Sequence, residues 1–411
     1  MLASSIRCCR LYRIASLRAP GRLVGFYEHP SQCRPFTVLA IESSADDTCA
    51  AVVSSSHEIL SNVIIKQHEI HKTHGGIHPF RAIQSHQQNM PIAVRRALDE
   101  ANVTMEDIDG VAFTRGPGAS QGMSGCLSVG SNAAKTLAAA LNKPLVGVHH
   151  MQAHALTALF TTPSDQLPKF PFLSLLISGG HTLLVLVSSK TSFKLIAESA
   201  DESIGCAYDK VSRLLELPWG DKGPGAALEQ FCLKKVDELP EIRPFAVPVP
   251  RQLVFSFSGL HSIVDKCIRE FPQPLSESHK VALARAFQTS AAEQLCSKLK
   301  LCFETLAGQK IFPKDVVVSG GVASNLFLRQ SLKQALDKYS GSTPSDRINF
   351  FFPPPHLCTD NAVMIAWASL HRFLARDYDD YSVELQAKWN IDAAPVATDP
   401  SDATTVQTPL E

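Results

Sequence analysis

The stretch "FPFLSLLISGGHTLLVLVSS" (residues 170–189) decides the fold, because two long apolar runs flank a short glycine turn. This pattern predicts a buried strand, a tight turn and a second buried strand. The earlier stretch "FTVLAIESSADDTCAAVVSS" (36–55) has the same order, and "EILSNVIIKQH" and "KLIAES" predict a third strand after each pair. Two similar starts, each followed by helices and more strands, indicate two related α/β lobes with a central cleft.

The remaining apolar patterns complete this two-lobed plan. They predict strands at 110–114, 144–150, 315–321 and 349–354, and helices at about 83–102, 118–141, 203–216, 225–236, 278–306, 323 onward and 361–375. We therefore divide the chain into a first α/β lobe at 36–150 and a second α/β lobe at 151–376.

The two ends of the chain differ from the core in charge. Residues 1–35 hold six arginines, no lysine and one acid, which is typical of a mitochondrial transit peptide and predicts location in the matrix. The alternative is a basic tail of another kind. Residues 377–411 hold eight acids and one lysine, and we expect an acidic, partly disordered tail.

The composition is that of a globular enzyme, with 45% hydrophobic and 19% charged residues in 411. No run of eighteen apolar residues occurs, so we expect no membrane span. The eleven cysteines are scattered without a C-x-x-C pair, which favours reduced, buried thiols over disulfides. The net charge of zero neither requires nor excludes nucleic acid as a partner.

The segment "VGVHHMQAHA" (146–155) contains a histidine pair with metal-ligand spacing. His150 and His154 are four residues apart, so on a helix they share one face and can bind one metal. A zinc peptidase needs a glutamate directly after the first histidine, and Met151 stands there instead. A metal at this site must therefore serve a different reaction, unless the two histidines are simply solvated or core residues.

Several glycine turns at strand ends can hold a ligand. "LLISGGHTLL" contains Ser178, Gly179 and Gly180, whose main-chain N–H groups can point at a phosphate. "VVSGGVASN" leads through Gly320 and Gly321 into a predicted helix. Taken alone, each of these patterns is equally consistent with an ordinary structural turn.

Acidic residues accompany the same turns. Asp46 and Asp47 in "ESSADDT" can hold a metal or a water, or can stabilise an Asx turn, and Asp46 is our candidate catalytic residue. Asp360 stands at a predicted helix start, where an aspartate is usually an N-cap. All these signals fall at strand ends of one two-lobed plan, where α/β proteins bind their ligands.

The motifs together resemble a known family. "AIESSADDT", "TRGPG", "HHMQAH", "ISGGHT", "AYDKVSRLLEL", "FSFSGL", "SGGVASN" and "CTDNAVMIA" occur in the order seen in the tRNA threonylcarbamoyladenosine synthase family, once labelled a glycoprotein endopeptidase. They run from about 38 to 367, and with the arginine-rich leader the chain is similar to the mitochondrial members. The resemblance implies two RNase H-like lobes of the actin/sugar-kinase/chaperone ATPase type.

The resemblance also implies a reaction and its site. A threonylcarbamoyl group would pass from threonylcarbamoyl-adenylate, supplied by a separate synthase, to N6 of the adenosine 3′ of the anticodon (position 37), with release of AMP. The tRNAs would be mitochondrial ones reading codons that start with A, and the enzyme would be a homodimer. His150, His154 and Asp360 match the family's ligands for one divalent cation, zinc or iron. Positions that match the adenylate site are Leu176, Ile177, Ser178, Gly179, Gly180, Asp209, Gly223, Gly225, Glu229, Gly320, Gly321 and Asn325.

Two other functions remain open on the sequence. One is a metallopeptidase, which the missing glutamate beside His150 disfavours. The other is a catalytically inactive nucleotide-binding scaffold of the same fold, which the complete ligand set disfavours.

Overall fold

The computed structural model describes residues 34–72, 77–118, 123–218, 220, 223–337 and 347–393. The predicted transit peptide lies outside these residues except for its last two positions, and so does the predicted tail beyond 393. Residues from Phe36 onward belong to one compact unit, and the description below concerns that unit.

The first lobe is built on a five-stranded sheet in the order β3-β2-β1-β4-β5. β1 pairs with β2 and β2 with β3 in antiparallel fashion, whereas β1, β4 and β5 are parallel. The strands are β1 (Thr37–Glu42), β2 (Thr48–Ser54), β3 (Ile59–Ile65), β4 (Gly110–Gly116) and β5 (Leu145–His149).

The second lobe repeats this sheet. Its order, β8-β7-β6-β9-β10, has the same two antiparallel pairs followed by two parallel pairs. The strands are β6 (Phe172–Ile177), β7 (Thr182–Val187), β8 (Phe193–Glu198), β9 (Asp315–Ser319) and β10 (Asn349–Phe351). The predicted duplication of an α/β lobe is thereby confirmed.

Helices separate and cover the two sheets. They are α1 (His68–Lys72), α2 (Pro79–Glu100), α3 (Ser124–Ala140), α4 (His150–Thr161), α5 (Ile204–Leu214), α6 (Gly223–Cys232), α7 (Ser258–Glu270), α8 (Glu277–Gly308), α9 (Leu326–Asp337), α10 (Pro355–Cys358) and α11 (Ala362–Leu374), with 3-10 turns η1 (Gly321–Ser324) and η3 (Ile391–Ala393). The short α1 and the whole of α7 were not predicted from the sequence.

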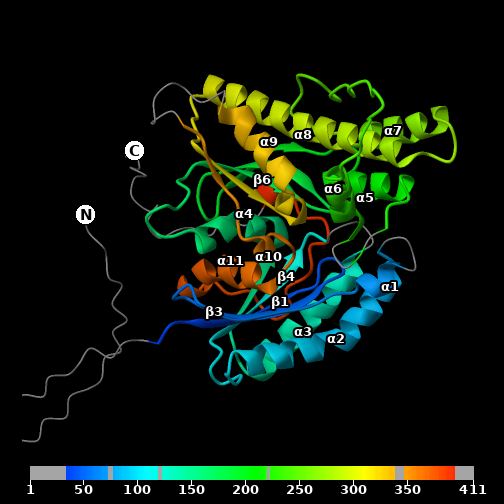
Figure 1. Cartoon of the computed structure of the whole chain (residues 1–411). Helices are drawn as coiled ribbons and strands as arrows, with labels where there is room; N and C mark the ends of the chain where they lie inside the picture. Colours follow the sequence, from blue (N-terminus) through cyan, green and yellow to red (C-terminus); the bar gives the residue numbers. More distant parts are fainter. Residues whose placement is uncertain are drawn as a thin grey trace, which may run out of the picture. The chain divides into compact units, whose positions relative to one another are not determined.

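The central strands are buried on both faces. Every residue of β1, β2, β6 and β7 is buried, which explains why these segments read as continuous apolar runs and not as alternating ones. α2 and α3 cover the outer face of the first sheet, and α4 and α11 lie between the two sheets (Figure 1). The helix that carries the histidine pair is therefore at the centre of the molecule.

The path of α11 differs from the predicted division of the chain. We placed residues up to 376 in the second lobe, yet α11 packs on β1, β2 and β4 of the first sheet. Its sequence is apolar nearly all round, so it needs contacts on several sides, and it has α4 on one side and the sheet on another. A side chain at Gly110 would collide with Phe373 of α11, so the glycine permits this close packing.

The segment 377–393, which we call the C-terminal strap, also differs from the prediction. It was expected to begin an acidic tail, but Asp377 and Asp379 both bind the guanidinium of Arg372. The Asp379 main-chain N–H donates to Leu145 in β5 at 2.8 Å. The first acids of the presumed tail are thus structural partners of a half-buried arginine.

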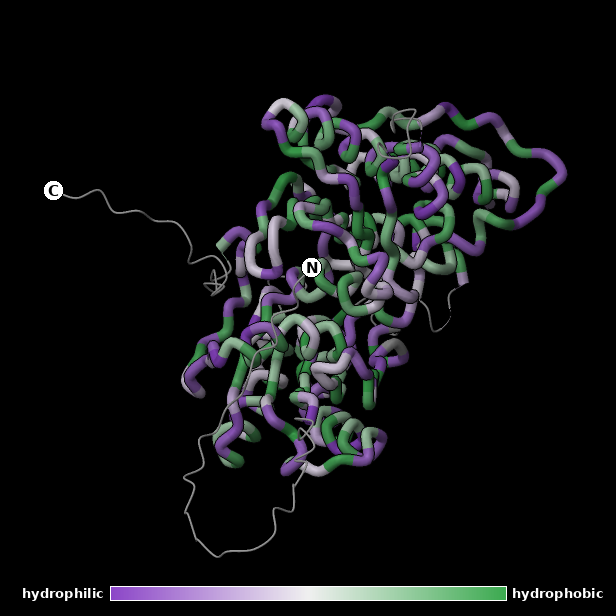
Figure 2. Tube along the Cα trace, turned by 90° about the vertical axis from the view of Figure 1, so that its left-hand side faces the viewer, coloured by the Kyte–Doolittle hydropathy of each residue, from purple (hydrophilic) through white to green (hydrophobic). Residues whose placement is uncertain are grey.

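Hydropathy changes every few residues along the outer helices (Figure 2), because only one face of each contacts a sheet. Within the described residues, no helix is both long and apolar enough to cross a membrane. The eight cysteines in this part of the chain are all free thiols.

Candidate metal centre and substrate cleft

The histidine pair sits in the first two turns of α4, directly after β5. The N-cap of α4 is His149, whose Nδ1 accepts from the main-chain N–H of Gln152 at 3.4 Å. This cap starts the helix at His150, so His150 and His154 project from the same face one turn apart. Both are buried, and their rings meet edge to face with centroids 4.7 Å apart.

Asp360 joins the two histidines from the far end of the sequence. The N-cap of α11 is its neighbour Asn361, whose side chain accepts from Met364 N–H at 3.0 Å. Asp360 is thereby left free of the capping role and turns its Oδ1 toward both rings. That oxygen lies 3.3 Å from His150 Nε2 and 3.1 Å from His154 Nε2.

These three residues form a set of donors suited to a divalent cation. One ligand atom from each lies within 4.8 Å of the others, and His150 and His154 are buried. Two imidazole nitrogens and one carboxylate oxygen at such spacing match the ligand types of zinc, and imidazole with carboxylate also suits iron. Three protein ligands leave coordination positions open for a substrate.

Glu42, at the end of β1, orients the first histidine. Its carboxyl group is 1% exposed, and Oε2 lies 3.3 Å from His150 Nδ1, on the side of the ring away from Asp360. Its other oxygen accepts from the N–H and the hydroxyl of Ser44, each at 2.6 Å, and the hydroxyl of Thr114 donates to Oε2. A carboxylate behind a ligating imidazole fixes the tautomer that leaves Nε2 open to a metal.

The electrostatics of this group follow from burial and from paired charges. Burial alone would lower the pKa of His150, but the carboxylates of Asp360 and Glu42 raise it to about 10. Burial disfavours ionised Asp360, yet His150 and His154 hold the pKa of that carboxyl well below its usual range. The same balance with His150 lowers the pKa of Glu42. Both carboxyl groups are therefore anionic at neutral pH and attract a cation.

The turn after β1 places two more acids near the centre. Asp46 and Asp47 are both half-buried. Burial, followed by the charges of Asp46 and Asp360, raises the pKa of Asp47 to about 8, so this carboxyl is largely protonated at pH 7. Burial raises the pKa of Asp209 in the second lobe, and the negative charge of Asp46 adds a smaller contribution in the same direction.

On the second lobe, the hairpin between β6 and β7 forms the predicted glycine turn. Ser178 Oγ accepts from His181 N–H at 3.0 Å, and space beyond Gly179 is open, since a Cβ there would meet no atom within 4 Å. Behind the turn, Gly205 at the start of α5 donates its N–H to the Ser178 carbonyl at 3.3 Å. The Gly179 carbonyl accepts from the Ser203 hydroxyl and the main chain of Gly179 packs against Gly205, whereas the Cβ side of Gly179 faces open space and both turn glycines are exposed.

The other glycine turn packs against this hairpin. Gly320 has φ +96° and lies so close to Ile177 that a Cβ would be 2.3 Å from the Ile177 carbonyl oxygen. Only glycine fits there. The side chains of Leu176 and Ile177 are buried in the core, so these two residues can offer a ligand only their main chain.

The polar residues predicted to bind adenylate also hold the local structure. Asp209 accepts from Gly225 N–H at 2.8 Å, and Glu229 accepts from Leu326 N–H at 2.8 Å. Asn325 precedes α9 and accepts from Leu328 N–H at 3.0 Å, which is an N-cap contact. Four close contacts link these segments to one another. They join residue 177 with 320, residue 178 with 205, residue 209 with 225, and residue 229 with 326. The predicted residues therefore form one region at the carboxyl ends of β6 and β9, with Gly223 and Gly321 beside it.

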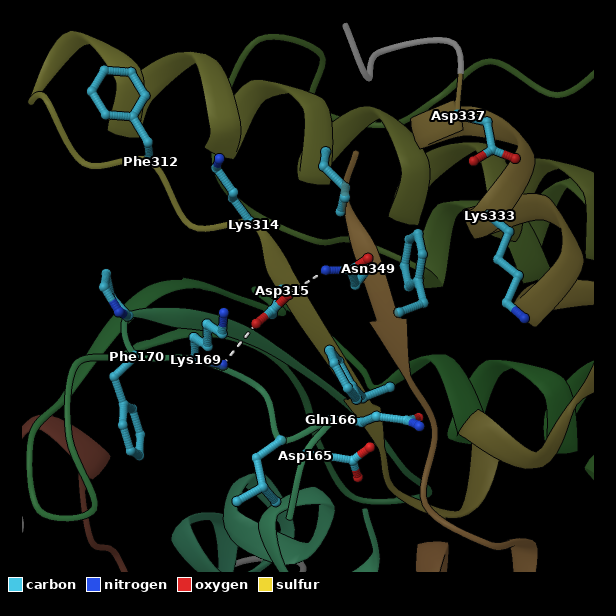
Figure 3. Close-up of a pocket in the computed structure, with 15 residues that line it drawn as sticks. Asp165, Gln166, Lys169, Phe170, Phe312, Lys314, Asp315, Lys333, Asp337 and Asn349 are labelled. Carbon is cyan, nitrogen blue, oxygen red and sulfur yellow. Dashed lines mark hydrogen bonds between the residues drawn. The ribbon is translucent and has the colours of Figure 1, made fainter. Parts of the chain in front are cut away.

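A pocket of about 760 Å³ lies away from these residues, at the N-terminal ends of β6, β9 and β10 (Figure 3). Its floor is tied together by Asp315, which accepts from the Lys169 N–H and from the Asn349 side chain. Asp165 and Asp337 line it together with Lys333, so it carries charges of both signs. None of the predicted site residues in the described chain lines this pocket.

The sequence as a whole matches a known family over most of its length. A family model described as tRNA N6-adenosine threonylcarbamoyltransferase matches residues 58–367. The chain belongs to the tRNA N6-adenosine threonylcarbamoyltransferase family. The matched range includes all three predicted metal ligands and all the predicted adenylate-binding residues.

Individual members of the threonylcarbamoyltransferase family are similar along most of their length. The mitochondrial tRNA N6-adenosine threonylcarbamoyltransferase of Schizosaccharomyces pombe is 38% identical over 374 residues, covering 87% of each chain. The tRNA N6-adenosine threonylcarbamoyltransferase of Listeria welshimeri is 38% identical over 352 residues, covering 84% of this chain and 94% of its own.

A likeness among solved structures concerns the fold alone. HypF from T. kodakarensis matches 84% of this chain and 48% of its own with a TM-score of 0.54 at 14% identity. The two α/β lobes predicted from the duplicated strand pattern, and the actin/sugar-kinase/chaperone ATPase type implied by the family resemblance, are confirmed by the repeated sheet order and this likeness.

Two residues near the metal centre were not among the predicted site residues. Glu42 was read as the last residue of a buried strand, although a carboxylate ending the apolar run "TVLAIE" is itself a signal. His181 closes the glycine hairpin, and burial followed by the charge of His150 lowers its pKa to about 4. Its imidazole is therefore neutral at pH 7.

Proposed function

We propose that this chain transfers a threonylcarbamoyl group from threonylcarbamoyl-adenylate to N6 of adenosine 37 in mitochondrial tRNAs that read codons starting with A. The observation that carries the proposal is the convergence of His150, His154 and Asp360 beside the open glycine hairpin. Family membership supplies the reaction class, and the intact ligand set supports an active enzyme over an inactive scaffold.

The proposed reaction is an acyl transfer to an amine. The adenine N6 forms a bond to the carbamoyl carbon, and the bond from that carbon to the phosphate oxygen breaks. The electron pair leaves with AMP, and N6 loses one proton to solvent. Because the donor is an activated mixed anhydride, positioning and charge stabilisation contribute more than a strong base would.

Different residues of the chain would bind the metal and the adenylate in this reaction. Bound at His150, His154 and Asp360, a zinc or iron cation would offset negative charge as the phosphate departs. The main chain of Gly179 and Gly180, with Gly320 and Gly321 beside it, offers groups that a ligand can approach closely because no side chain intervenes. The remaining polar positions, Asp209, Glu229 and Asn325 with Gly223 and Gly225, border the ribose and base end of this region.

A peptidase is disfavoured by the position of the nearest glutamate. In a zinc peptidase the glutamate follows the first histidine and activates the metal's water. Here Met151 follows His150, and Glu42 lies against Nδ1 on the other side of the ring. Glu42 therefore supports a ligand and cannot act as that base.

The mitochondrial location and the homodimer are further parts of the proposal. The arginine-rich leader and the mitochondrial relative at 38% identity support import into the matrix. For the dimer, support comes from a groove of about 660 Å³ between α2 and α3, lined by Met90, Val94 and Val129, with the half-exposed Ile92 on α2. Light scattering of Ile92→Arg against the unmodified protein would test whether this face holds two copies together.

Reconstitution tests the activity directly. The purified protein, unmodified mitochondrial tRNA and threonylcarbamoyl-adenylate made by a separate synthase should yield threonylcarbamoyladenosine, detected by mass spectrometry of nucleosides. His154→Ala should lose the metal and the product, and Asp209→Ala should weaken adenylate binding while keeping the metal. Product formation by a metal-free His154→Ala protein would refute the proposed role of the metal, and no product from the intact protein would refute the activity.

A further inference from the structure

A second pocket, of about 610 Å³, is lined by residues that neighbour the metal ligands in the sequence. It is lined by His149 and Met151, the neighbours of the ligand His150, by His181 at the hairpin tip, by the edge of β7 and β8, and by strap residues 387–391. None of the described adenylate-binding residues lines it. The pocket is therefore distinct from the residues predicted to bind the adenylate.

The C-terminal strap forms one wall of this pocket and touches both lobes. On the first lobe, Gly118 N–H donates to Ala387, and Gln386 N–H donates to the carbonyl of Arg115. The strap lies so close to β4 that a Cβ on Gly116 would be 1.9 Å from the Gln386 carbonyl oxygen. On the second lobe, the N–H of Leu195 in β8 donates to Asp392. The strap residues that line the pocket are thus anchored to the first lobe at Gln386 and Ala387 and to the second lobe at Asp392.

Within the strap, Trp389 is held in place by its neighbours. The guanidinium of Arg115 lies 5.3 Å from the centre of the indole, and the His149 ring lies 4.8 Å from it. His149 Nδ1 accepts from Gln152, so its Nε2 carries the proton and donates to the Trp389 carbonyl at 3.1 Å. One histidine therefore caps the metal-bearing helix and fixes the aromatic wall of the pocket.

We propose that this pocket receives the acceptor adenine of the tRNA, turned out of the anticodon loop. The inference rests on the proposed function, because that reaction needs two nucleotides at the metal centre at once, and the adenylate positions account for only one. The volume falls in the range of small-ligand sites. Flipped or unpaired bases bind in pockets that combine aromatic side chains with hydrogen-bonding groups.

The composition of the pocket matches a purine in an unpaired nucleotide. Trp389 and the apolar side chains of Leu183 and Leu195 suit the faces of the base, and Asn390 and Glu198 offer polar groups at its edges. The exposed Lys388 and the nearby Arg115 lie where the flanking phosphates would pass. An adenine there would direct its exocyclic amine toward the metal side of the pocket, where the carbamoyl carbon is expected.

Steady-state kinetics with the full enzyme test the acceptor site. Trp389→Ala should lower kcat/KM for tRNA by about 5- to 100-fold, the usual effect of losing one base–aromatic contact. The KM for threonylcarbamoyl-adenylate and the metal content should not change, and Trp389→Phe should restore most of the loss. The matched control is Phe312→Ala, which removes an aromatic side chain that is 67% exposed at the distant pocket of Figure 3.

Photocrosslinking provides a test that needs no variant. A tRNA anticodon stem-loop with 8-azidoadenosine at the acceptor position should label a peptide containing residues 181–198 or 387–391 of the unmodified protein. Labelling near Phe312 would overturn the acceptor assignment.

The kinetic outcomes are separate. A kcat/KM for tRNA in Trp389→Ala within twofold of the unmodified enzyme would also overturn the assignment. A raised KM for the adenylate in Trp389→Ala would instead place the threonyl part of the donor in this pocket. If the unmodified enzyme binds the adenylate but modifies no tRNA, it is the proposed function that fails.

Discussion

Replacing Glu42 by glutamine should weaken metal binding without unfolding the protein. In the carboxylate, Oε1 accepts from Ser44 and Oε2 faces both Thr114 and His150 Nδ1. A glutamine side chain has one oxygen and one NH₂ group. The oxygen must face Ser44, because the main-chain N–H there is a donor that cannot turn away. The NH₂ group is then directed at His150 Nδ1.

The expected consequence is a change of tautomer. With an NH₂ group against it, His150 Nδ1 must accept, so the imidazolium of the metal-free site loses its Nδ1 proton and the ring keeps its proton on Nε2, the nitrogen that faces Asp360 and the metal site. Metal binding would require this proton to move back against an opposing donor. Loss of an outer partner of a ligating histidine typically lowers metal affinity by about 10- to 100-fold. This corresponds to about 1.4–2.7 kcal/mol of binding free energy.

The measurement is a competition titration of zinc against a chelator, with circular dichroism to confirm the fold. Glu202→Gln is the matched control, because Glu202 also holds a histidine, His261, through Nδ1 but lies outside the set of metal donors. We expect the control to bind zinc like the unmodified protein. If Glu42→Gln binds zinc within threefold of the unmodified protein, or if both variants lose affinity equally, the argument about His150 is refuted.

Four further perturbations follow from the sequence and the contacts described above. A tagged 36–411 protein should remain in the cytosol, and its import into mitochondria would contradict a leader in the first 35 residues. His149→Asn should keep a full metal equivalent by elemental analysis, because asparagine can also cap α4; loss of the metal would make His149 a ligand. Asn325→Ala should lower the free energy of unfolding by about 1 kcal/mol through loss of the α9 cap, measured by urea titration; no change would leave Asn325 a purely binding role. Burial, followed by the charges of Lys190 and Arg372, lowers the pKa of His371 to about 4. Below pH 6.5 the unfolded chain therefore binds more protons than the folded one, and the free energy of unfolding falls as the pH is lowered toward 4. His371→Gln should reduce this slope by up to about 1.4 kcal/mol per pH unit, measured by urea titrations between pH 4 and pH 6.5, and an unchanged slope would contradict the argument.

The fold could be predicted because it depends on patterns that are local in sequence. Two apolar strand pairs with short turns, each followed by a third strand, were enough to indicate a duplicated lobe. The later elements were placed less well. α7 begins at Ser258 after a stretch in which three prolines interrupt the apolar residues, and only two of its side chains are fully buried. The position of α11 depends on tertiary packing against β1 and β2, which no local pattern contains.

The features of the candidate site that are local in sequence could likewise be predicted, whereas those that depend on tertiary contacts could not. The spacing of His150 and His154 is a local property of one helix, and it indicated two of the three candidate metal donors that the structure brings together. The support given by Glu42 depends on β1 ending beside the start of α4, 108 residues later in the chain. Similarly, the strap from 377 onward was read from its charge alone. Two of its acids, Asp377 and Asp379, are held in place by Arg372, which lies in the last turn of α11.

Asp360 shows how a neighbouring residue changes the meaning of a motif. A lone aspartate at a helix start is most often an N-cap, and that interpretation would remove it from the metal site. In "CTDNAVMIA", however, Asn361 follows and is an equally good cap, and its side chain accepts from Met364 N–H. With the cap supplied, the carboxylate of Asp360 is not needed by the helix and can face His150 and His154. In Asn361→Ala the N-cap of α11 is lost, and Asp360 is the nearest side chain that can replace it. If the Asp360 carboxylate turns to the helix, it no longer faces His150 and His154. We expect that variant to lose metal affinity although no ligand has been removed. A full metal equivalent in Asn361→Ala, bound as tightly as in the unmodified protein, would show that Asp360 is fixed by its histidine contacts alone.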